Sequence, residues 1–367
     1  MQVEATLARP LGAIRSARIS AHRDPVRTGV WVAALGLAVA AALVRHSSLL
    51  GAAGTTWPAF LTLAAVIAGG LALDGVGLFR LLARLVIPAA APRWLVTAGA
   101  LSFTALLSGL VNLDVAVVVA VPVTLVVARE RGLPAGRLVV AAALTANATS
   151  FLLPTSNLTT LLVLDHAPLG AWAYLRDSWL AWLLVTALTV GTLTVLMHIG
   201  HRSSTVRTRK GEAGGTDPAR LSSPRSSERP ERGRAGVEQA ILALLDLVPM
   251  FIAAASIRAL LDGGMTLGGG LLAQLGMASG LAAGANNLPA AAAVVASGRL
   301  SMWAAVLGLA IGPNLLMTGS VASLITRRIA RDRGAGFGVV AFSLTGATML
   351  PFQLIVALIG LRLAGAL

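Results

Sequence analysis

The residues that could do chemistry in this chain stand at four short polar interruptions of long apolar runs. The first two are VNLD at 111–114 and PTSN at 154–157, and the second two are ANNLP at 285–289 and PNLLMTGS at 313–320. Hydrocarbon cannot satisfy loose backbone N–H and C=O groups, so such breaks survive at membrane depth only where they are buried or line a water-filled cavity. Because the breaks take corresponding places in two halves of the chain, they predict the substrate site of a secondary transporter.

Each interruption carries residues that can begin a new helix, with its orphan N–H groups and the positive end of its dipole. Asp114 can cap the helix after the first break, and Asn286 or Asn287 can cap the helix after the third, with Pro289 in its first turn. Four such starts meeting near the midplane would favour an anion or an oxygen-rich neutral solute. The alternative for any single break is a tolerated proline kink or a hydrogen bond between helices. The predicted substrate-binding residues are Asn112, Thr155, Ser156, Asn157, Asn286, Asn287, Thr318, Gly319 and Ser320.

Three acids within apolar runs are candidates for coupling transport to a proton or another ion, because a buried acid is costly in a membrane. Asp114 stands at a hairpin tip and is the strongest of them, with helix capping as the alternative role. Asp74 lies near the inner end of a span, where solvation at the interface is an equal alternative. Asp246 lies inside a later span, where its alternative role is to pair with another helix.

Composition places these residues in an all-α polytopic membrane protein. The 367 residues are 56% hydrophobic and 12% charged, whereas a soluble domain has about 25% charged residues. Apolar runs near the length that crosses a bilayer recur along the chain. The chain has no cysteine, its five histidines lack metal-ligand spacing, and the common enzyme motifs are missing. We therefore expect neither an enzyme, nor a cofactor, nor a metal site.

The net charge of +14 indicates orientation rather than a nucleic-acid partner. The arginines gather in tails and loops between apolar spans, as the positive-inside rule describes. Their placement predicts a multi-pass protein of the cell (inner or plasma) membrane, with the N-terminus in the cytosol and the C-terminus outside.

Arginine placement and the breaks together divide the chain into an N-terminal addition and two repeats of inverted topology. Residues 1–55 hold a cytosolic tail and an extra first span, and residues 201–237 form a disordered, basic cytosolic linker. We expect the hairpins to be re-entrant because the first tip is polar and tight, although limbs that cross fully would give the same parity. The first expected repeat is 56–200, with a span at 56–79, a hairpin at 94–128, a broken span at 137–164 and a span at 172–198. The second is 238–367, with a span at 239–260, a hairpin at 271–298, a broken span at 301–326 and a span at 337–362.

Several of these stretches resemble the arsenical pump membrane protein family, the arsenite/antimonite exporters of the ion transporter superfamily. The resemblance rests on LALDGVGLF, NLDVAVVVAVP, LLPTSNLTTLLV, FIAAASIRAL, AGANNLPA and IGPNLLMTGSVASLI. Two positions depart from the family pattern: Leu113 separates Asn112 from Asp114, and Asn314 stands where a lysine is typical. Neither tip carries the Ser-Asn-Thr triplet of sodium-coupled relatives, which favours a proton over sodium. Superfamily relatives are often dimers, so the resemblance implies that a homodimer is possible.

The resemblance implies export of trivalent arsenite or antimonite, and the residues suggest proton antiport as its mechanism. A neutral trihydroxide could bind the Asn and Ser groups of the breaks, while Asp114 would take up a proton from outside and release it inside. The first alternative is an ion-coupled transporter of a small carboxylate or inorganic anion, which suits four positive helix ends equally well. The second is a membrane scaffold that transports nothing and whose partners dock on the basic linker. The expected partners are a small-molecule or metalloid substrate, the coupling proton and the lipid bilayer, without nucleic acid.

Overall fold

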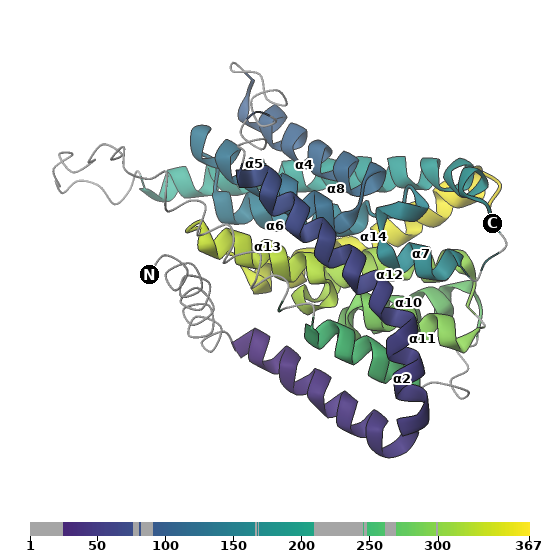
Figure 1. The fold of residues 1–367 in the computed structure, drawn as a ribbon. Helices are drawn as coiled ribbons and strands as arrows, with labels where there is room; N and C mark the ends of the chain where they lie inside the picture. The colour runs from purple at the N-terminus through teal and green to yellow at the C-terminus, as the bar shows by residue number, and fades with distance from the viewer. Residues whose placement is uncertain are drawn as a thin grey trace, which may run out of the picture.

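The computed structural model describes residues 25–75, 81, 91–165, 167, 169–208, 245, 248–260, 269–298 and 300–367. Those residues form helices joined by turns, and no strand occurs among them (Figure 1). Four helical stretches are long and apolar enough to cross a membrane: Thr28–Gly54, Arg93–Leu110, Ala171–Ile199 and Val339–Leu363. The predicted all-α polytopic class is confirmed.

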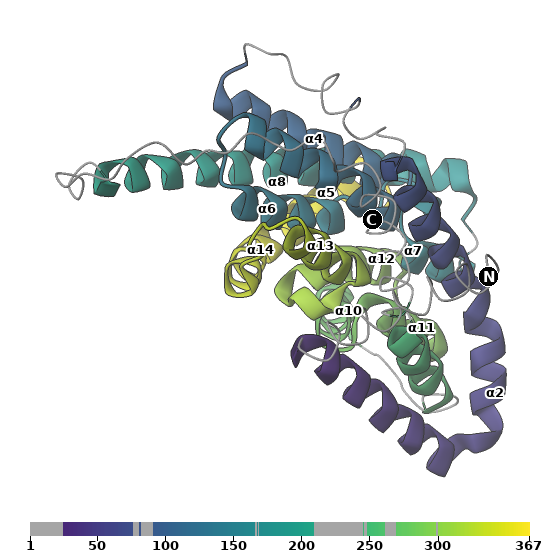
Figure 2. The ribbon, with the colours of Figure 1, turned by 60° about the vertical axis from the view of Figure 1, so that its left-hand side comes forward.

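Helix α2 (Pro25–Gly75) runs along the outside of the other helices and bends at Arg45, where φ is −140° and ψ is 43° (Figures 1 and 2). The sequence predicts two spans at 29–45 and 56–79 with a loop between them, whereas the structure carries the helix through that loop. Residues 46–55 contain no proline, and the helix continues through them although they include Gly51 and Gly54. The first arm exposes large apolar side chains such as Val39 and Leu43, as expected of a segment whose surroundings are lipid.

Two helical hairpins occupy the places predicted for them. The first is α4 (Arg93–Leu110) and α5 (Leu113–Glu130), and the second is α10 (Leu271–Ala285) and α11 (Asn287–Ser297). At about 1.5 Å per residue, the 11 residues of α11 rise about 16 Å, roughly half of the hydrocarbon core. Re-entry into the membrane stays a prediction that this short limb favours.

Each hairpin is followed by a helix that breaks and resumes. In the first half, α6 (Ala135–Ala148) leads through the 3-10 turn η1 (Pro154–Ser156) into α7 (Leu158–Leu164). In the second, α12 (Met302–Ile311) leads through η2 (Gly312–Leu315) and η3 (Met317–Gly319) into α13 (Val321–Asp332). Pro154 and Pro313 each stand at the start of a 3-10 turn, and extended residues separate the turns from the helices that follow. The interruptions therefore lie where the polar clusters predict them.

A long helix closes each half, α8 (Ala171–Thr208) in the first and α14 (Val339–Leu363) in the second, and the two pack together. Their approach is close, since a Cβ built on Gly360 would lie 2.4 Å from the Cα of Ala181. The order of hairpin, broken helix and long helix thus occurs twice. The predicted disordered linker begins at 201, but α8 continues to Thr208, and residues 209–237 lie outside the described residues.

Candidate substrate site

The first or second residue of each helix that follows a break contributes to one apolar cluster of the core. The cluster contains Leu113 of α5, Leu288 of α11 and Val321 of α13, and Leu158 of α7 packs against it. The helices also pack across the two halves, with α5 against α13 and α11 against α7. Leu113 and Val321 are more than 200 positions apart in the sequence, and both belong to this cluster.

Asparagine caps both helix starts of the first half. Asn112 Oδ1 accepts a 2.9 Å hydrogen bond from the N–H of Asp114, and Asn157 Oδ1 accepts a 3.1 Å bond from the N–H of Thr159. Each bond satisfies one of the orphan N–H groups of a helix start. The expectation that Asp114 caps α5 is corrected, because the residue two positions earlier takes that role and Asp114 lies in the first turn.

The second half repeats the arrangement with different residues. Asn286 Oδ1 accepts a 3.3 Å bond from the N–H of Leu288, and Ser320 Oγ accepts a 3.2 Å bond from the N–H of Ala322. Of the two adjacent asparagines proposed as the cap of α11, the first holds the position. All four caps accept a bond from the N–H two residues ahead; Asn112, Asn157 and Ser320 are extended, whereas Asn286 has a positive φ.

Each hairpin tip is also tied to the broken helix of its own half. Asn112 Nδ2 donates a 2.9 Å hydrogen bond to the carbonyl oxygen of Thr155, and Asn286 Nδ2 donates a 2.9 Å bond to that of Thr318. One asparagine thus caps the second limb of the hairpin with its oxygen and holds the broken helix with its nitrogen. The same device in both halves shows that the predicted site residues of each half do come together.

Asn286 adopts a backbone conformation that is rare for a residue with a side chain. Its φ of +75° and ψ of 147° fall in a region that glycine populates far more readily. Such a conformation costs about 1–3 kcal/mol and is found mostly where surrounding structure enforces it, often at ligand sites. The two hydrogen bonds of the Asn286 side chain hold the tip in this shape.

Asp114 lies at the start of α5 with 7% of its surface exposed. Its backbone N–H is bonded to Asn112, but within the described part of the chain no donor or cation pairs with its carboxylate. Leu288 takes the corresponding place after the cap of α11. At this position the first half therefore carries an acid and the second an alkyl group.

The remaining predicted site residues differ in what they can offer a ligand. Ser156 is fully buried and its hydroxyl donates to the Leu153 carbonyl at 2.6 Å, whereas Asn287 is buried with its Oδ1 lacking a partner in the described structure. Gly319 already donates its N–H to the Leu316 carbonyl, and a Cβ there would lie 2.8 Å from the Cα of Pro313. Gly319 is thus needed for close packing of the break.

Two of the acids proposed for coupling are not placed at these helix starts. Asp74 belongs to α2, but its side chain is outside the described structure, and Asp246 lies outside the described residues altogether. In the described part of the chain, no three His, Cys, Asp or Glu side chains gather closely enough to hold a metal ion.

A buried polar contact between the halves was missed in the sequence. Asn147 Nδ2 donates to Asn314 Oδ1 at 3.1 Å and to Ser323 Oγ at 3.0 Å, and Asn314 Nδ2 donates to the Leu144 carbonyl at 3.1 Å. The signal was present, because Asn147 is an amide inside the apolar run that precedes the first break. The sequence did not predict the contact because Asn314, the partner of Asn147, lies 167 residues further along the chain.

The model of the CitMHS family, described as citrate transporter, matches residues 23–345 of this chain. The match covers both hairpins, both broken helices, the whole of α8 and the beginning of α14. The chain belongs to the CitMHS citrate transporter family. A comparison with curated proteins gave no match.

Membership in the citrate transporter family, together with the apolar helices, makes this a multi-pass membrane transporter of the secondary type. The family is of the ion-transporter kind, which agrees with the broader level of the resemblance seen in the sequence. It does not support the narrower resemblance to arsenical pumps, nor the arsenite export that this resemblance implied.

Proposed function

We propose that this protein carries a small polycarboxylate of the citrate class across the membrane, with its carboxylates held at the four helix starts. The family match supports a carboxylate as the substrate. The single observation that carries the proposal is the gathering of the starts of α5, α7, α11 and α13 around one cluster. Each cap satisfies one N–H of its helix, so other N–H groups and the positive dipole ends are left for oxygens of a bound anion.

The site gains its specificity for anions from dipoles and amides. Asn112, Asn157, Asn286 and Ser320 are the four caps, and each side-chain oxygen accepts a hydrogen bond from the backbone of its helix. A site built in this way holds an anion firmly enough for selectivity and still releases it, which a transport cycle requires. Asn287, with its buried and unpartnered Oδ1, is available to accept a hydrogen bond from a hydroxyl of the substrate.

We further propose that Asp114 couples this transport to protons. An ionised carboxylate at the start of α5 would repel a carboxylate of the substrate in a site of low dielectric constant, and protonation removes that repulsion. Substrate binding therefore favours the protonated acid, and by linkage proton uptake favours substrate binding to the same degree. Proton and substrate then move in the same direction, which is symport.

Export of arsenite or antimonite by proton antiport is the competing function. A neutral trihydroxide would use the amide and hydroxyl groups of the caps but would gain little from four positive helix ends. A membrane scaffold that transports nothing is the remaining alternative, and it requires none of the four matched caps. The transport assay below separates the three.

The deciding experiment is uptake of radiolabelled citrate into proteoliposomes that contain the purified protein. We expect uptake above that of empty liposomes, faster when the outside is acidic, and competition by unlabelled di- and tricarboxylates. Ser320→Ala should slow uptake, and Ser297→Ala should not, because Ser297 bonds only to its own helix at the far end of α11. Arsenite flux without citrate flux, or no flux of any solute, would overturn the proposal.

A further inference from the structure

The first break leaves a short stretch of backbone outside any helix. Helix α6 ends at Ala148, and the 3-10 turn η1 begins at Pro154. Residues 149–152 between them are buried, so their carbonyl oxygens need partners from the protein. These carbonyls also stand at the carboxyl end of α6, where the helix dipole is negative. Open carbonyls at this place would repel an anion that binds at the break.

One face of α8 supplies hydrogen-bond donors to this stretch. The three donors are spaced four residues apart, so their side chains lie on one side of the helix. They form a donor row of Tyr174, Ser178 and Trp182. Each of them bonds one carbonyl oxygen of the stretch. The distances are 2.7 Å from the Tyr174 hydroxyl to Phe151, 2.8 Å from the Ser178 hydroxyl to Leu152 and 2.8 Å from Trp182 Nε1 to Thr149.

Two packing contacts orient the aromatic members of the donor row. The ring of Tyr174 stacks on Trp303 of α12, with the ring centroids 5.2 Å apart. The indole of Trp182 lies against Gly109 of α4, where an added Cβ would be 2.6 Å from Nε1. The row is therefore held by the second half of the chain at one end and by the first hairpin at the other.

The stretch that the donor row holds is bonded to the predicted site residue Asn157. Ser150, in the middle of the stretch, accepts a 3.1 Å hydrogen bond from Asn157 Nδ2 and donates its own hydroxyl to the Asn147 carbonyl at 2.9 Å. A shift of the stretch would therefore move Asn157. The side chains of α8 thus reach the substrate site through the backbone of the break.

The second half does not repeat the donor row in its described part. Its closing helix α14 meets the second break at Gly346, where the backbone is too close to the Asn314 carbonyl to admit a Cβ. Among the described residues, one carbonyl of 312–319 is bonded by a side chain, that of Thr318 by Asn286 of the hairpin. A broken helix can therefore form without a donor row, so folding alone does not require the one on α8.

We propose that the donor row sets the charge preference of the substrate site, an inference that rests on the proposed transport of a polycarboxylate. By bonding the carbonyls at the carboxyl end of α6, Tyr174, Ser178 and Trp182 weaken the negative potential that an anion meets at the first break. They are positioning residues, because they bond the backbone of the break. The more negative the substrate, the more its binding depends on them.

Competition between substrates of different charge tests the proposal. Tricarballylate and glutarate share a three-carbon chain and differ by one carboxylate, and each is titrated against uptake of radiolabelled citrate into proteoliposomes. In Ser178→Ala and Tyr174→Phe, the half-inhibition concentration of tricarballylate should rise about three- to tenfold, the loss expected for one hydrogen bond. That of glutarate should rise less, and the maximal rate of citrate uptake should be kept because the row acts on binding. An equal rise for both competitors would indicate a structural role alone and refute the proposal.

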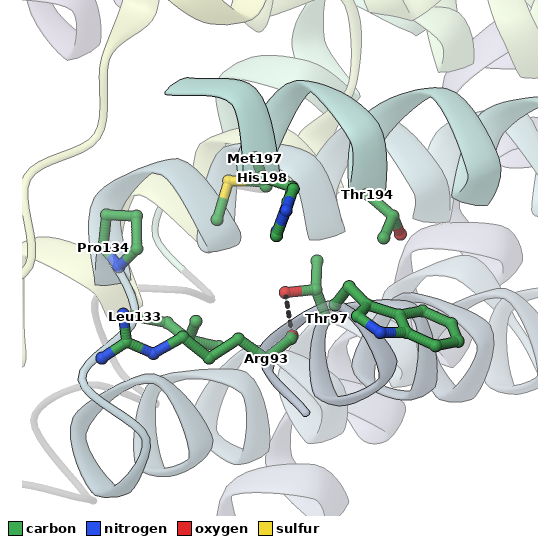
Figure 3. A pocket seen from close by; sticks show the side chains of 8 residues that line it. Arg93, Thr97, Leu133, Pro134, Thr194, Met197 and His198 are labelled. Carbon is green, nitrogen blue, oxygen red and sulfur yellow. Dashed lines mark hydrogen bonds between the residues drawn. The ribbon is translucent and has the colours of Figure 1, made fainter. Parts of the chain in front are cut away.

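Thr97→Val is the matched control. Thr97 is also buried, and its hydroxyl donates to the Arg93 carbonyl at 3.0 Å (Figure 3). This bond lies in the first turn of α4, at the opposite end of that helix from the hairpin tip. Both half-inhibition concentrations should equal those of the unmodified protein. A rise for tricarballylate as large as in Ser178→Ala would overturn the proposal.

Gly109→Ala tests the donor row while it leaves every donor in the chain. The added methyl group would push the Trp182 indole away from the Thr149 carbonyl, so this variant should lose affinity for tricarballylate as Trp182→Phe does. Unchanged affinity in Gly109→Ala and Ser178→Ala would overturn the proposal even if the aromatic variants do not fold.

Citrate uptake by the unmodified protein, measured in the same series, separates this inference from the proposed function. Absence of that uptake overturns the proposed function and this inference with it. Normal uptake, with variants that treat the two competitors alike, overturns this inference alone.

Discussion

Asn147 and Asn314 meet between the two halves of the chain, where Nδ2 of the first lies 3.1 Å from Oδ1 of the second. Both side chains are 1% exposed. Asn147 also donates to Ser323, and Asn314 donates to the Leu144 carbonyl. Because Asn147 lies just before the break of the first half and Asn314 lies inside that of the second, this contact fixes the two broken helices against each other at the level of their breaks.

Replacement of Asn314 by alanine should destabilise the protein markedly. It leaves the Asn147 amide and the Leu144 carbonyl without one partner each, and an unpaired buried polar group costs about 1–3 kcal/mol. We expect the unfolding temperature in detergent to fall by several degrees, with a smaller drop for Thr348→Ala, whose exposed hydroxyl bonds only within its own helix. Equal effects of the two substitutions would show that the contact contributes little.

Gly346→Ala should be poorly tolerated although alanine is the better helix former. A Cβ at this position of α14 would lie 1.7 Å from the backbone oxygen of Asn314, so α14 would have to move away from the second break. Overpacking of this kind typically costs about 1–3 kcal/mol. Gly191→Ala is the matched control, because nothing lies within 4 Å of a Cβ there and the change should stabilise α8 slightly. Unfolding temperatures measured side by side test the contrast, and a neutral Gly346→Ala would contradict it.

The two hairpin asparagines should respond differently to alanine and glycine. Asn286 has a positive φ, so Asn286→Gly should be more stable than Asn286→Ala, which adds backbone strain to the lost bonds. At Asn112 φ is −172°, an extended value that any residue adopts, so Asn112→Gly should be no better than Asn112→Ala. The four unfolding temperatures measure this, and an advantage of glycine at both positions, or at neither, would argue against the conformation described for the second tip.

Asp114→Asn should separate substrate binding from proton coupling. The amide keeps the size of the acid but cannot give up a proton, so uptake driven by a proton gradient should fall to the level of empty liposomes. Exchange of internal for external citrate at equal pH should survive, and its rate should no longer depend on the outside pH. Asp165→Asn, an exposed acid beyond the end of α7, should behave as the unmodified protein. Gradient-driven uptake that persists in Asp114→Asn would reject the coupling role.

The breaks could be located from the sequence because their signals are local. Proline before a cluster of Thr, Ser and Asn ends one helix and caps the next within a few residues, and Pro154 and Pro313 both stand where such a cluster predicts the interruption. The hairpin limbs are bounded in the same way by the tips at Asn112 and Asn286. Apolar length was sufficient to predict the long helices α8 and α14.

The features that could not be predicted from the sequence either involve residues far apart in the chain or have no local sequence signal. The contact between Asn147 and Asn314 forms only when two helices from different halves cross. Asn112 caps α5 in place of Asp114 because the backbone is extended at Asn112 and already helical at Asp114. Residues 46–55, with two glycines and two serines, carry no local signal for the helix that they form beyond the bend at Arg45. The family came from comparison of the whole chain, since short motifs are shared among transporters of different cargo.

The substitution of an alkyl group for an acid at equivalent places, Leu288 for Asp114, has a consequence for direction. Two halves built to one plan would make the two mouths of the pathway interchangeable, and a substrate would meet the same chemistry from either side of the bilayer. A single titrating group in one half removes that equivalence. Under the proposed coupling through Asp114, the proton gradient acts on the half that contains α5.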